Sequence, residues 1–147
     1  MDNKALNYMA LARKAGRIEL GEEPVGAVTR AQKAPLVIVA GDASDHTWRR
    51  ALSFVAGTNQ QCLRLEATKE ELGIAIGRTS LAIAAFTDAA LALAFVKALG
   101  DPEKHKVLLE ALETRTKRIQ QRRKEAKAHE KNKQTGKRRI AAVKKEH

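Results

Sequence analysis

The chain lacks the residues that covalent and metal-based stabilisation require. One cysteine, Cys62, occurs in 147 residues, which excludes an intrachain disulfide and a cysteine-rich metal site. The four histidines are scattered, and no pair has the four-residue spacing that places two metal ligands on one helix face. We therefore expect a reducing compartment, the cytoplasm, and no metal or other cofactor.

Aromatic residues and long apolar runs are also scarce. Aromatic residues make up 3% of the chain against 44% for all hydrophobic residues, many of them alanine, so the core should be small and closely packed. The candidate membrane span, residues 81–99, is interrupted by Thr87-Asp88 and carries Lys97, which favours a strand, a turn and a helix. Residues 1–13 show a polar helical pattern rather than a signal peptide. We expect no membrane association.

Patterns typical of catalysis are missing as well. A glycine-rich phosphate loop with a lysine does not occur. Cys62 lies within a strand pattern, where a buried and unreactive thiol is the simpler interpretation. The acidic pairs at residues 22–23 and 70–71 each occupy the first turn of a predicted helix, where carboxylates stabilise the helix dipole. The sequence therefore predicts a protein that is not an enzyme.

Positive charge is present in excess, and it is unevenly distributed. Residues 1–100 carry 12 Lys/Arg against 10 Asp/Glu, whereas residues 101–147 carry 16 against 7. A neutral first part followed by a strongly basic last third indicates a polyanionic partner, with nucleic acid the first choice and an anionic membrane surface the second.

The most informative local pattern is the apolar, β-branched run from Leu36 to Ala40. It lies between Pro35 and Gly41 and shows no alternation, which predicts a strand buried on both faces in the middle of a sheet. The residues that follow, 42–44, can cap a new helix. A buried strand that ends in a polar, helix-starting turn is where α/β folds place their ligand sites.

The rest of the first hundred residues alternates between helix and strand patterns. Helices are predicted over 3–14, 22–32, 44–56, 68–77 and 88–100, and strands over 17–20, 36–40, 62–65 and 80–86. In the helix over 44–56, Leu52 and Val55 are expected to face the sheet, and Thr68 with Glu71 forms a capping box. The order predicts an α/β fold: a three-layer α/β/α sandwich with a four-stranded mixed sheet.

The composition changes at Asp101-Pro102. One more amphipathic helix is predicted from the apolar residues Val107, Leu108, Leu109, Leu112 and Ile119. From Gln120 onward large apolar residues nearly disappear, so this stretch is either a solvated helix or disordered. We therefore predict a domain at 1–100 and a basic extension at 101–147 that is helical and then disordered.

Several short segments recur in the order and spacing of a known family. They are Leu11-Ala12-Arg13-Lys14-Ala15-Gly16, Gly21-Glu22-Glu23, the stretch 34–44, Thr68-Lys69-Glu70-Glu71-Leu72-Gly73 and Ile76-Gly77-Arg78. Over roughly residues 4–99 the set resembles the ribosomal protein L-seven-Ae / L-thirty-e superfamily, and most of all its bacterial YlxQ-type branch. The resemblance implies an α/β/α sandwich that binds structured RNA, often kink-turns.

The resemblance also implies where RNA binds. In that family the turn entering the second helix holds RNA, helped by the turns after the central strand and before the last strand. Carried over to this chain, the candidate RNA-binding residues are Lys14, Arg17, Gly21, Glu22, Glu23, Asp42, Ser44, Ile76, Arg78 and Leu81. The mode would be helix N-terminal amides meeting phosphates or base edges, with Ile76 and Leu81 supporting a splayed base. The Asn-Glu pair and later lysine of archaeal-type kink-turn binders are replaced here by Glu23, Pro24 and Ala27.

The basic extension supplies a second set of candidates. Its predicted phosphate-contacting residues are Arg118, Arg122, Arg123, Lys124, Lys137, Arg138 and Arg139. The alternative is a solubilising tail in which Glu residues are interspersed. Lone Trp48 has two interpretations: it stacks on an extruded base, or it packs against a neighbouring helix.

Together these patterns predict a cytoplasmic, bacterial and non-enzymatic RNA-binding protein, monomeric and associated with ribosomal RNA or the ribosome. The alternative is a protein–protein interaction adaptor of the same fold without specific RNA binding. The acidic pairs at residues 22–23 and 70–71 would suit such an adaptor.

Overall fold

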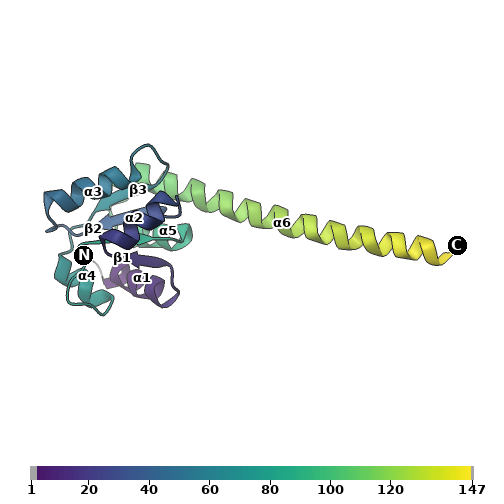
Figure 1. Ribbon diagram of the computed structural model, residues 1–147, viewed down its shortest axis with the longest axis horizontal. Coiled ribbons are helices and arrows are strands. Elements are labelled where there is room, and N and C mark those ends of the chain that lie inside the picture. Colours follow the sequence, from purple (N-terminus) through teal and green to yellow (C-terminus); the bar gives the residue numbers. More distant parts are fainter. Residues whose placement is uncertain (1–2, 147) are drawn as a thin grey trace. The chain divides into compact units, whose positions relative to one another are not determined.

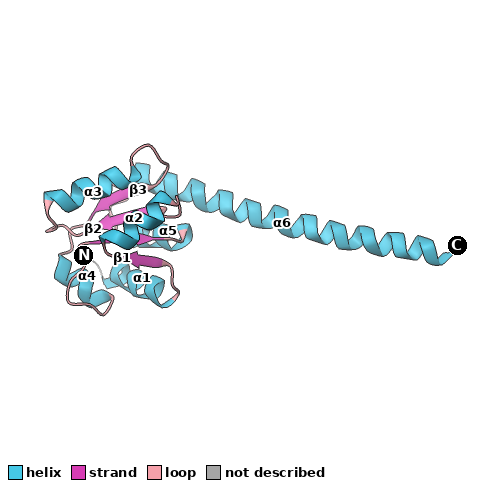
Figure 2. Cartoon of the chain, viewed as in Figure 1, coloured by secondary structure: helices cyan, strands magenta, loops and turns pink. Residues whose placement is uncertain are grey.

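The computed structural model describes the backbone of residues 3–146 and the side chains of residues 3–129. Its elements are α1 (Asn3–Lys14), β1 (Ile18–Leu20), α2 (Glu22–Arg30), β2 (Leu36–Val39), α3 (Asp45–Val55), β3 (Gln61–Arg64), α4 (Lys69–Ala75), β4 (Ile83–Phe86), α5 (Ala89–Ala98) and α6 (Lys106–Glu146) (Figures 1 and 2). The chain divides into two compact units, unit 1 (Met1–Arg115) and unit 2 (Thr116–His147).

The four strands form one mixed sheet in the order β1-β4-β2-β3. β2 runs parallel to β3 and antiparallel to β4, and β1 pairs antiparallel with β4. All four residues of β2 are buried, as the uninterrupted apolar run predicts for a central strand. The predicted α/β class with a four-stranded mixed sheet is confirmed.

Helices cover both faces of the sheet. Because side chains alternate along a strand, Leu36, Ile38 and Phe86 share one face, and Val37 and Val39 point to the other. The first face packs against α1, α4 and α5, and the second against α2 and α3.

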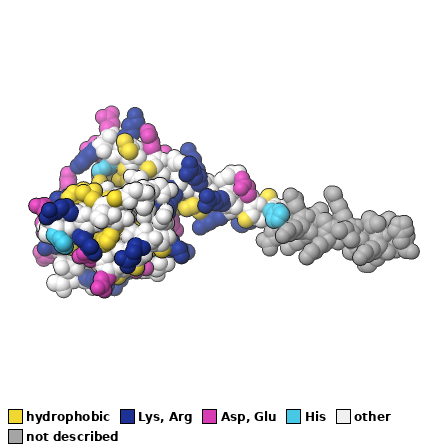
Figure 3. Space-filling model, turned by 45° about the horizontal axis from the view of Figure 1, so that its top comes forward, with side chains coloured by type: hydrophobic (Ala, Val, Ile, Leu, Met, Phe, Trp, Pro, Cys, Tyr) yellow, Lys and Arg dark blue, Asp and Glu magenta, His cyan; other side chains and the backbone are white. Residues whose placement is uncertain are grey.

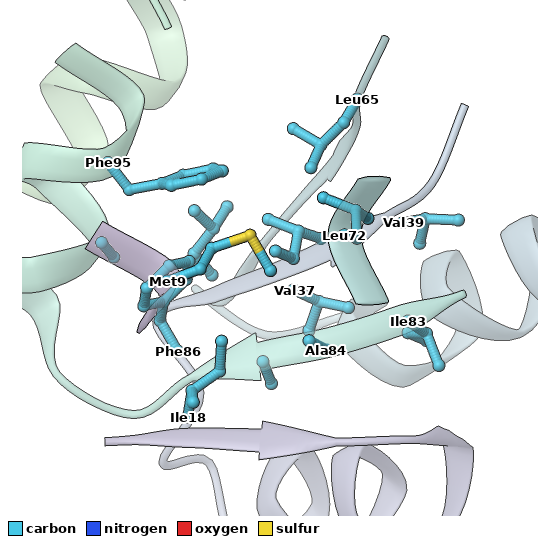
Figure 4. Packing of buried hydrophobic residues seen from close by; sticks show 14 of the residues in the cluster. Met9, Ile18, Val37, Val39, Leu65, Leu72, Ile83, Ala84, Phe86 and Phe95 are labelled. Atoms are coloured by element: carbon cyan, nitrogen blue, oxygen red, sulfur yellow. The ribbon is translucent and has the colours of Figure 1, made fainter. Parts of the chain in front are cut away.

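Large side chains from three helices fill the space over the first face. The ring of Phe86 lies 5.0 Å from that of Phe95 in α5, centroid to centroid. Figure 4 shows Met9 of α1 and Leu72 of α4 beside them, and all four side chains are fully buried. The helices on the two faces make a three-layer sandwich.

The predicted helix starts are confirmed where a polar side chain caps the helix. The Ser44 hydroxyl accepts a hydrogen bond from the Thr47 backbone N–H and begins α3. Thr68 and Glu71 form the predicted capping box of α4. The Asp88 carboxylate accepts from the first amides of α5. These caps act over three residues, which is why the sequence alone locates them.

Two local predictions are wrong. Leu52 was expected to face the sheet, but it is 43% exposed, and Ala51 with partly buried Val55 occupies the inner side of α3. Adjacent residues on a helix are turned by about 100°, so a pattern displaced by one position selects the wrong face. The last strand begins at Ile83 rather than Ser80, because the preceding residues lie against α4 at Gly73.

The beginning of α6 belongs to the core of unit 1. Leu112 is 1% exposed, and Leu108 and Leu109 pack against the same buried cluster. The sequence predicts either a solvated helix or disorder from Gln120 onward. The structure has a helix there, because α6 continues to Glu146. The division into a binding domain at 1–100 and an extension at 101–147 remains a prediction. No helix within residues 3–146 combines the length and the apolar character needed to cross a membrane.

Candidate nucleic-acid interface

Three turns that the resemblance assigns to RNA meet at one end of the sheet. β4 is antiparallel to β1 and β2, so the ends of β1 and β2 lie beside the beginning of β4. The Gly21 N–H donates to the Ile83 carbonyl (3.0 Å), and the Ala40 N–H to that of Ala82 (2.9 Å). We call this the loop end and define it by residues 21–23, 41–45, 66–71 and 79–82.

Hydrogen bonds hold the turns of the loop end to one another. The Asp42 carboxylate accepts from the Lys69 N–H at 2.8 Å, and the Lys69 carbonyl accepts from the Leu81 N–H at 2.9 Å. The Gly41 N–H donates to the carbonyl of Ala67 at 2.8 Å. Asp42, a predicted RNA-binding residue, therefore also fixes the start of α4 against the end of β2.

Gly41 makes the closest backbone approach at the loop end. A Cβ atom at this position would lie 2.5 Å from the Leu65 carbonyl oxygen and 3.1 Å from that of Glu66. Both neighbours are backbone atoms that cannot rotate away. We predict that Gly41→Ala lowers the free energy of unfolding by about 1–3 kcal/mol, measured by urea denaturation.

Gly26→Ala is the matched control for this change. Gly26 lies inside α2, and the added methyl group would meet the rim of the Phe54 ring at 3.2 Å, a side chain that can shift. Alanine also favours a helix interior over glycine by about 1 kcal/mol. The control should keep wild-type stability, and equal losses in the two variants would contradict the close approach at Gly41.

The N-terminus of α2 is the centre of the predicted interface. Gly21 precedes the helix with φ 97°, and no side chain caps the first turn. The Glu22 carboxylate accepts from Nε of Arg50 at 2.7 Å, so one of the two first-turn charges is paired with a cation of α3. The Arg50 guanidinium also lies 5.0 Å from the centroid of the Phe54 ring.

A hollow lies between α2 and α3 beside this ion pair. Its volume is about 600 Å³. It is bounded by Glu22, Glu23, Gly26, Arg30, Arg50 and Phe54. Arg50 is a contributor that sequence reasoning missed, because nothing in the sequence indicates which residue of α3 faces α2.

The apolar residues expected to support a splayed base are not exposed. Ile76 is 4% and Leu81 3% exposed, so both belong to the core in this structure. The Arg13 guanidinium donates to the Ile76 carbonyl and holds that turn against α1. Arg78 is exposed two residues further on.

Lys14 and Arg17 do not lie at the loop end. The Arg17 carbonyl accepts from the N–H of Thr87 at 2.9 Å, and Thr87 follows the last residue of β4. The Gly21 N–H instead donates to the carbonyl of Ile83, the first residue of β4. Four residues of extended chain span about 13 Å, so β1 separates Arg17 from the turn that the resemblance joins it to. We correct the expected grouping of Arg17 with residues 21–25 accordingly.

Trp48 packs within unit 1. Its side chain is partly buried against the core cluster, and the Arg64 guanidinium lies 5.9 Å from the ring centroid. Nη2 of Arg64 also donates to the Ala43 carbonyl at 2.9 Å. These contacts favour the packing interpretation of Trp48 and link the turn after β2 to the end of β3.

The thiol of Cys62 is held in its neutral form. Burial raises its pKa to about 12 from 9.0. Between these values the unfolded chain releases a proton that the folded chain retains, so stability must fall as pH rises.

Within residues 3–129 no group of three or more His, Cys, Asp or Glu side chains could hold a metal ion.

We predict that the stability advantage of the wild type over Cys62→Ala shrinks by about 2 kcal/mol between pH 8.5 and pH 10.5. Urea denaturation of both proteins at each pH measures this difference, and Lys and Tyr titration cancels between them. A difference that does not change with pH would show that the thiol ionises as readily in the folded chain as in the unfolded one.

Unit 2 carries dense positive charge. Its side chains from residue 116 to residue 129 include six Lys/Arg and one carboxylate, Glu125, which accepts from the Gln121 amide at 3.1 Å. Figure 3 shows dark blue side chains along this stretch. The predicted contacts Arg118, Arg122, Arg123 and Lys124 are all exposed. The side chains of Lys137, Arg138 and Arg139 lie outside the described residues.

Known proteins resemble parts of this chain in sequence or in fold. No family model matches the chain. The chain is similar to the RNA-binding protein YlxQ of Enterococcus faecium, with 45% identity over 67 residues. That segment is 46% of this chain and 65% of the relative, so the chain spans slightly less than two thirds of the relative's length.

Two solved structures share the fold. A protein of unknown function from Bacillus halodurans superposes with a TM-score of 0.62 at 24% identity, covering 67% of this chain and 98% of the other. The Giardia lamblia 15.5kD RNA binding protein superposes with a TM-score of 0.57 at 20% identity, covering 72% and 88%. These two structures share the fold of this chain, and the match to YlxQ agrees with the YlxQ-type resemblance that the sequence motifs indicate.

Proposed function

We propose that this chain is a non-enzymatic, cytoplasmic RNA-binding protein that associates with ribosomal RNA and acts as a monomer. The loop end recognises a structured RNA, such as a kink-turn, and the cations of unit 2 bind phosphates. The observation that carries the proposal is the convergence of the three turns at one end of the sheet. The sequence similarity of this chain to a protein named as RNA-binding supports the same proposal.

The geometry of the loop end suits recognition of shape. The first amides of α2 have no side-chain cap and point out of the helix N-terminus, where they can donate to phosphate or base edges. Hydrogen bonds through Lys69 join Asp42 to the turn at 79–82, and the Gly21 N–H joins the start of α2 to β4. A Lys/Arg-rich segment without aromatic residues binds backbone rather than sequence, so unit 2 supplies affinity while the loop end supplies selectivity.

Fluorescence anisotropy tests the proposal directly. The full chain is titrated into a labelled ribosomal RNA fragment that contains a kink-turn, and into a plain duplex of equal length, across a salt series. We expect tighter binding to the kinked RNA and a salt slope near −4 from the cations of unit 2 alone, which corresponds to about five phosphate contacts at 0.7–0.9 each. Absence of affinity for both RNAs at about 50 mM salt would end the proposal.

An adaptor without RNA binding is the second candidate, and one observation favours it. Glu22, Glu23, Glu70 and Glu71 all lie at the loop end. An acidic surface of this kind suits a basic protein partner. The anisotropy series separates the two candidates, because an adaptor should show no preference for kinked over plain RNA.

A further inference from the structure

Unit 1 is nearly neutral, yet half of its carboxylates lie at one end of the sheet. It holds 15 Lys/Arg against 14 Asp/Glu. Half of these carboxylates belong to the segments of the loop end. They are Glu22, Glu23, Asp42, Asp45, Glu66, Glu70 and Glu71. The end that the resemblance assigns to RNA is therefore rich in the charge that repels phosphate.

The opposite end of the sheet gathers cations. Arg17 precedes β1, and its backbone carbonyl accepts a hydrogen bond from the N–H of Thr87, which follows β4. Leu36, at the start of β2, pairs with Phe86, so Lys33 in the preceding turn lies at the same end. Nη2 of Arg115 donates to the carbonyl of Gln32 at 3.3 Å. We call Lys14, Arg17, Lys33 and Arg115 the basic end.

Of the carboxylates close to this end, Asp88 and Glu113 are already engaged, and Glu19 is exposed. Asp88 caps α5 through hydrogen bonds of 2.8 Å and 3.2 Å to backbone amides. Glu113 precedes Arg115 by two residues, and its Oε1 lies 3.9 Å from Nζ of Lys97. Glu19 is exposed on β1, one residue beyond Ile18. Within the described residues no carboxylate forms an ion pair with a member of the basic end.

Three of the four cations are available to an outside partner. Lys14, Arg17 and Lys33 are exposed, and within the described residues their side chains make no hydrogen bond or ion pair. Arg115 is held by Gln32, a non-glycine residue with φ 56°, and one of its guanidinium nitrogens is buried without a partner. Arg115 therefore brings positive charge to the basic end without a neutralising acid.

The starts of β1 and β2 are close enough for one nucleic-acid strand to reach both. The two strands are separated by β4, and neighbouring strands lie about 4.8 Å apart, so the backbones at Ile18 and Leu36 are about 10 Å apart. That distance corresponds to the rise of about three nucleotides at 3.4 Å each. Arg17 directly precedes Ile18, and Lys33 lies in the turn before Leu36.

We propose that the basic end is a second RNA-binding site, which holds the sugar-phosphate backbone of a duplex arm through Lys14, Arg17 and Lys33. The proposal rests on the proposed RNA-binding function and adds a surface that faces away from the loop end. The site reads no bases, because it offers only cations, and it takes plain and kinked duplexes alike.

The test is a triple substitution, Lys14→Gln, Arg17→Gln and Lys33→Gln, in the full chain. Its matched control removes three exposed cations from other parts of unit 1, Arg49→Gln, Lys104→Gln and Lys106→Gln, with the same change in net charge. The probes are the labelled plain duplex and the kink-turn fragment described above. Circular dichroism checks that both variants are folded.

The basic-end variant should bind both RNAs about 10- to 100-fold more weakly at 0.1 M salt, with the salt slope reduced by about 2. The control should lose less than about threefold. Equal losses in the two variants would overturn the site, because net charge alone would then explain binding. Wild-type affinity in the basic-end variant would also overturn it while leaving the proposed function intact, whereas failure of the wild type to bind either RNA removes that function itself.

Discussion

Ending the chain after Arg115 is expected to weaken binding of structured RNA by about 100-fold or more at 0.1 M salt and to reduce the salt slope by about 4. Residues 116–147 carry 13 Lys/Arg against 3 Asp/Glu, which is nearly the whole net charge of +11. Each phosphate that a cation neutralises releases a counterion, so losing about five contacts removes most of the salt-dependent affinity. Fluorescence anisotropy with the kink-turn fragment measures both quantities.

The truncated chain should remain folded, because the core and Leu112 lie within unit 1. A full-length control with glutamine at the six described cations of unit 2 separates charge from length. The substituted positions are Lys117, Arg118, Arg122, Arg123, Lys124 and Lys127. This control should recover only part of the lost affinity, while its preference for kinked RNA persists. Unchanged affinity and slope in the truncated chain would show that unit 2 is a solubilising tail.

Leu112→Ala should lower the free energy of unfolding of unit 1 by about 2–5 kcal/mol, the range found for large-to-small changes in a core. Leu112 is 1% exposed and belongs to the buried core cluster, against which Leu108 and Leu109 pack. The lost methyl groups leave a cavity that the surrounding helices can only partly close. Urea denaturation followed by circular dichroism measures the change.

Val107→Ala is the matched control for Leu112. It also shortens an apolar side chain of α6, but Val107 is 77% exposed. The control should therefore change stability by no more than about 0.5 kcal/mol. A Leu112→Ala variant as stable as the wild type would mean that the first turns of α6 do not complete the core in solution.

Much of the fold could be predicted from sequence because its signals are local. The uninterrupted run at Leu36–Val39 marks a central strand, and Ser44, Thr68 and Asp88 mark helix starts through bonds to residues two or three positions away. The side of α3 that packs inward was harder to predict. Leu52 was assigned to the wrong side because an alanine, Ala51, is the residue that packs inward.

The candidate site was less predictable because it depends on how distant segments meet. The sequence identified the turns at Gly21, at Asp42 and before the last strand separately, but the convergence of Gly21, Asp42 and Leu81 follows from the antiparallel pairing of β4 with β1 and β2. The same pairing carries Arg17 to the opposite end. The Glu22–Arg50 ion pair and the burial of Ile76 likewise depend on tertiary contacts, which no local pattern encodes.

The two outer strands bear on how the protein behaves at high concentration. β1 has three residues and β3 four, and each leaves one row of backbone donors and acceptors without a neighbouring strand within the described residues. Rows this short offer few sites for a foreign strand, and charged Glu19 and Arg64 sit on them. The sheet is therefore a poor template for self-association into fibrils.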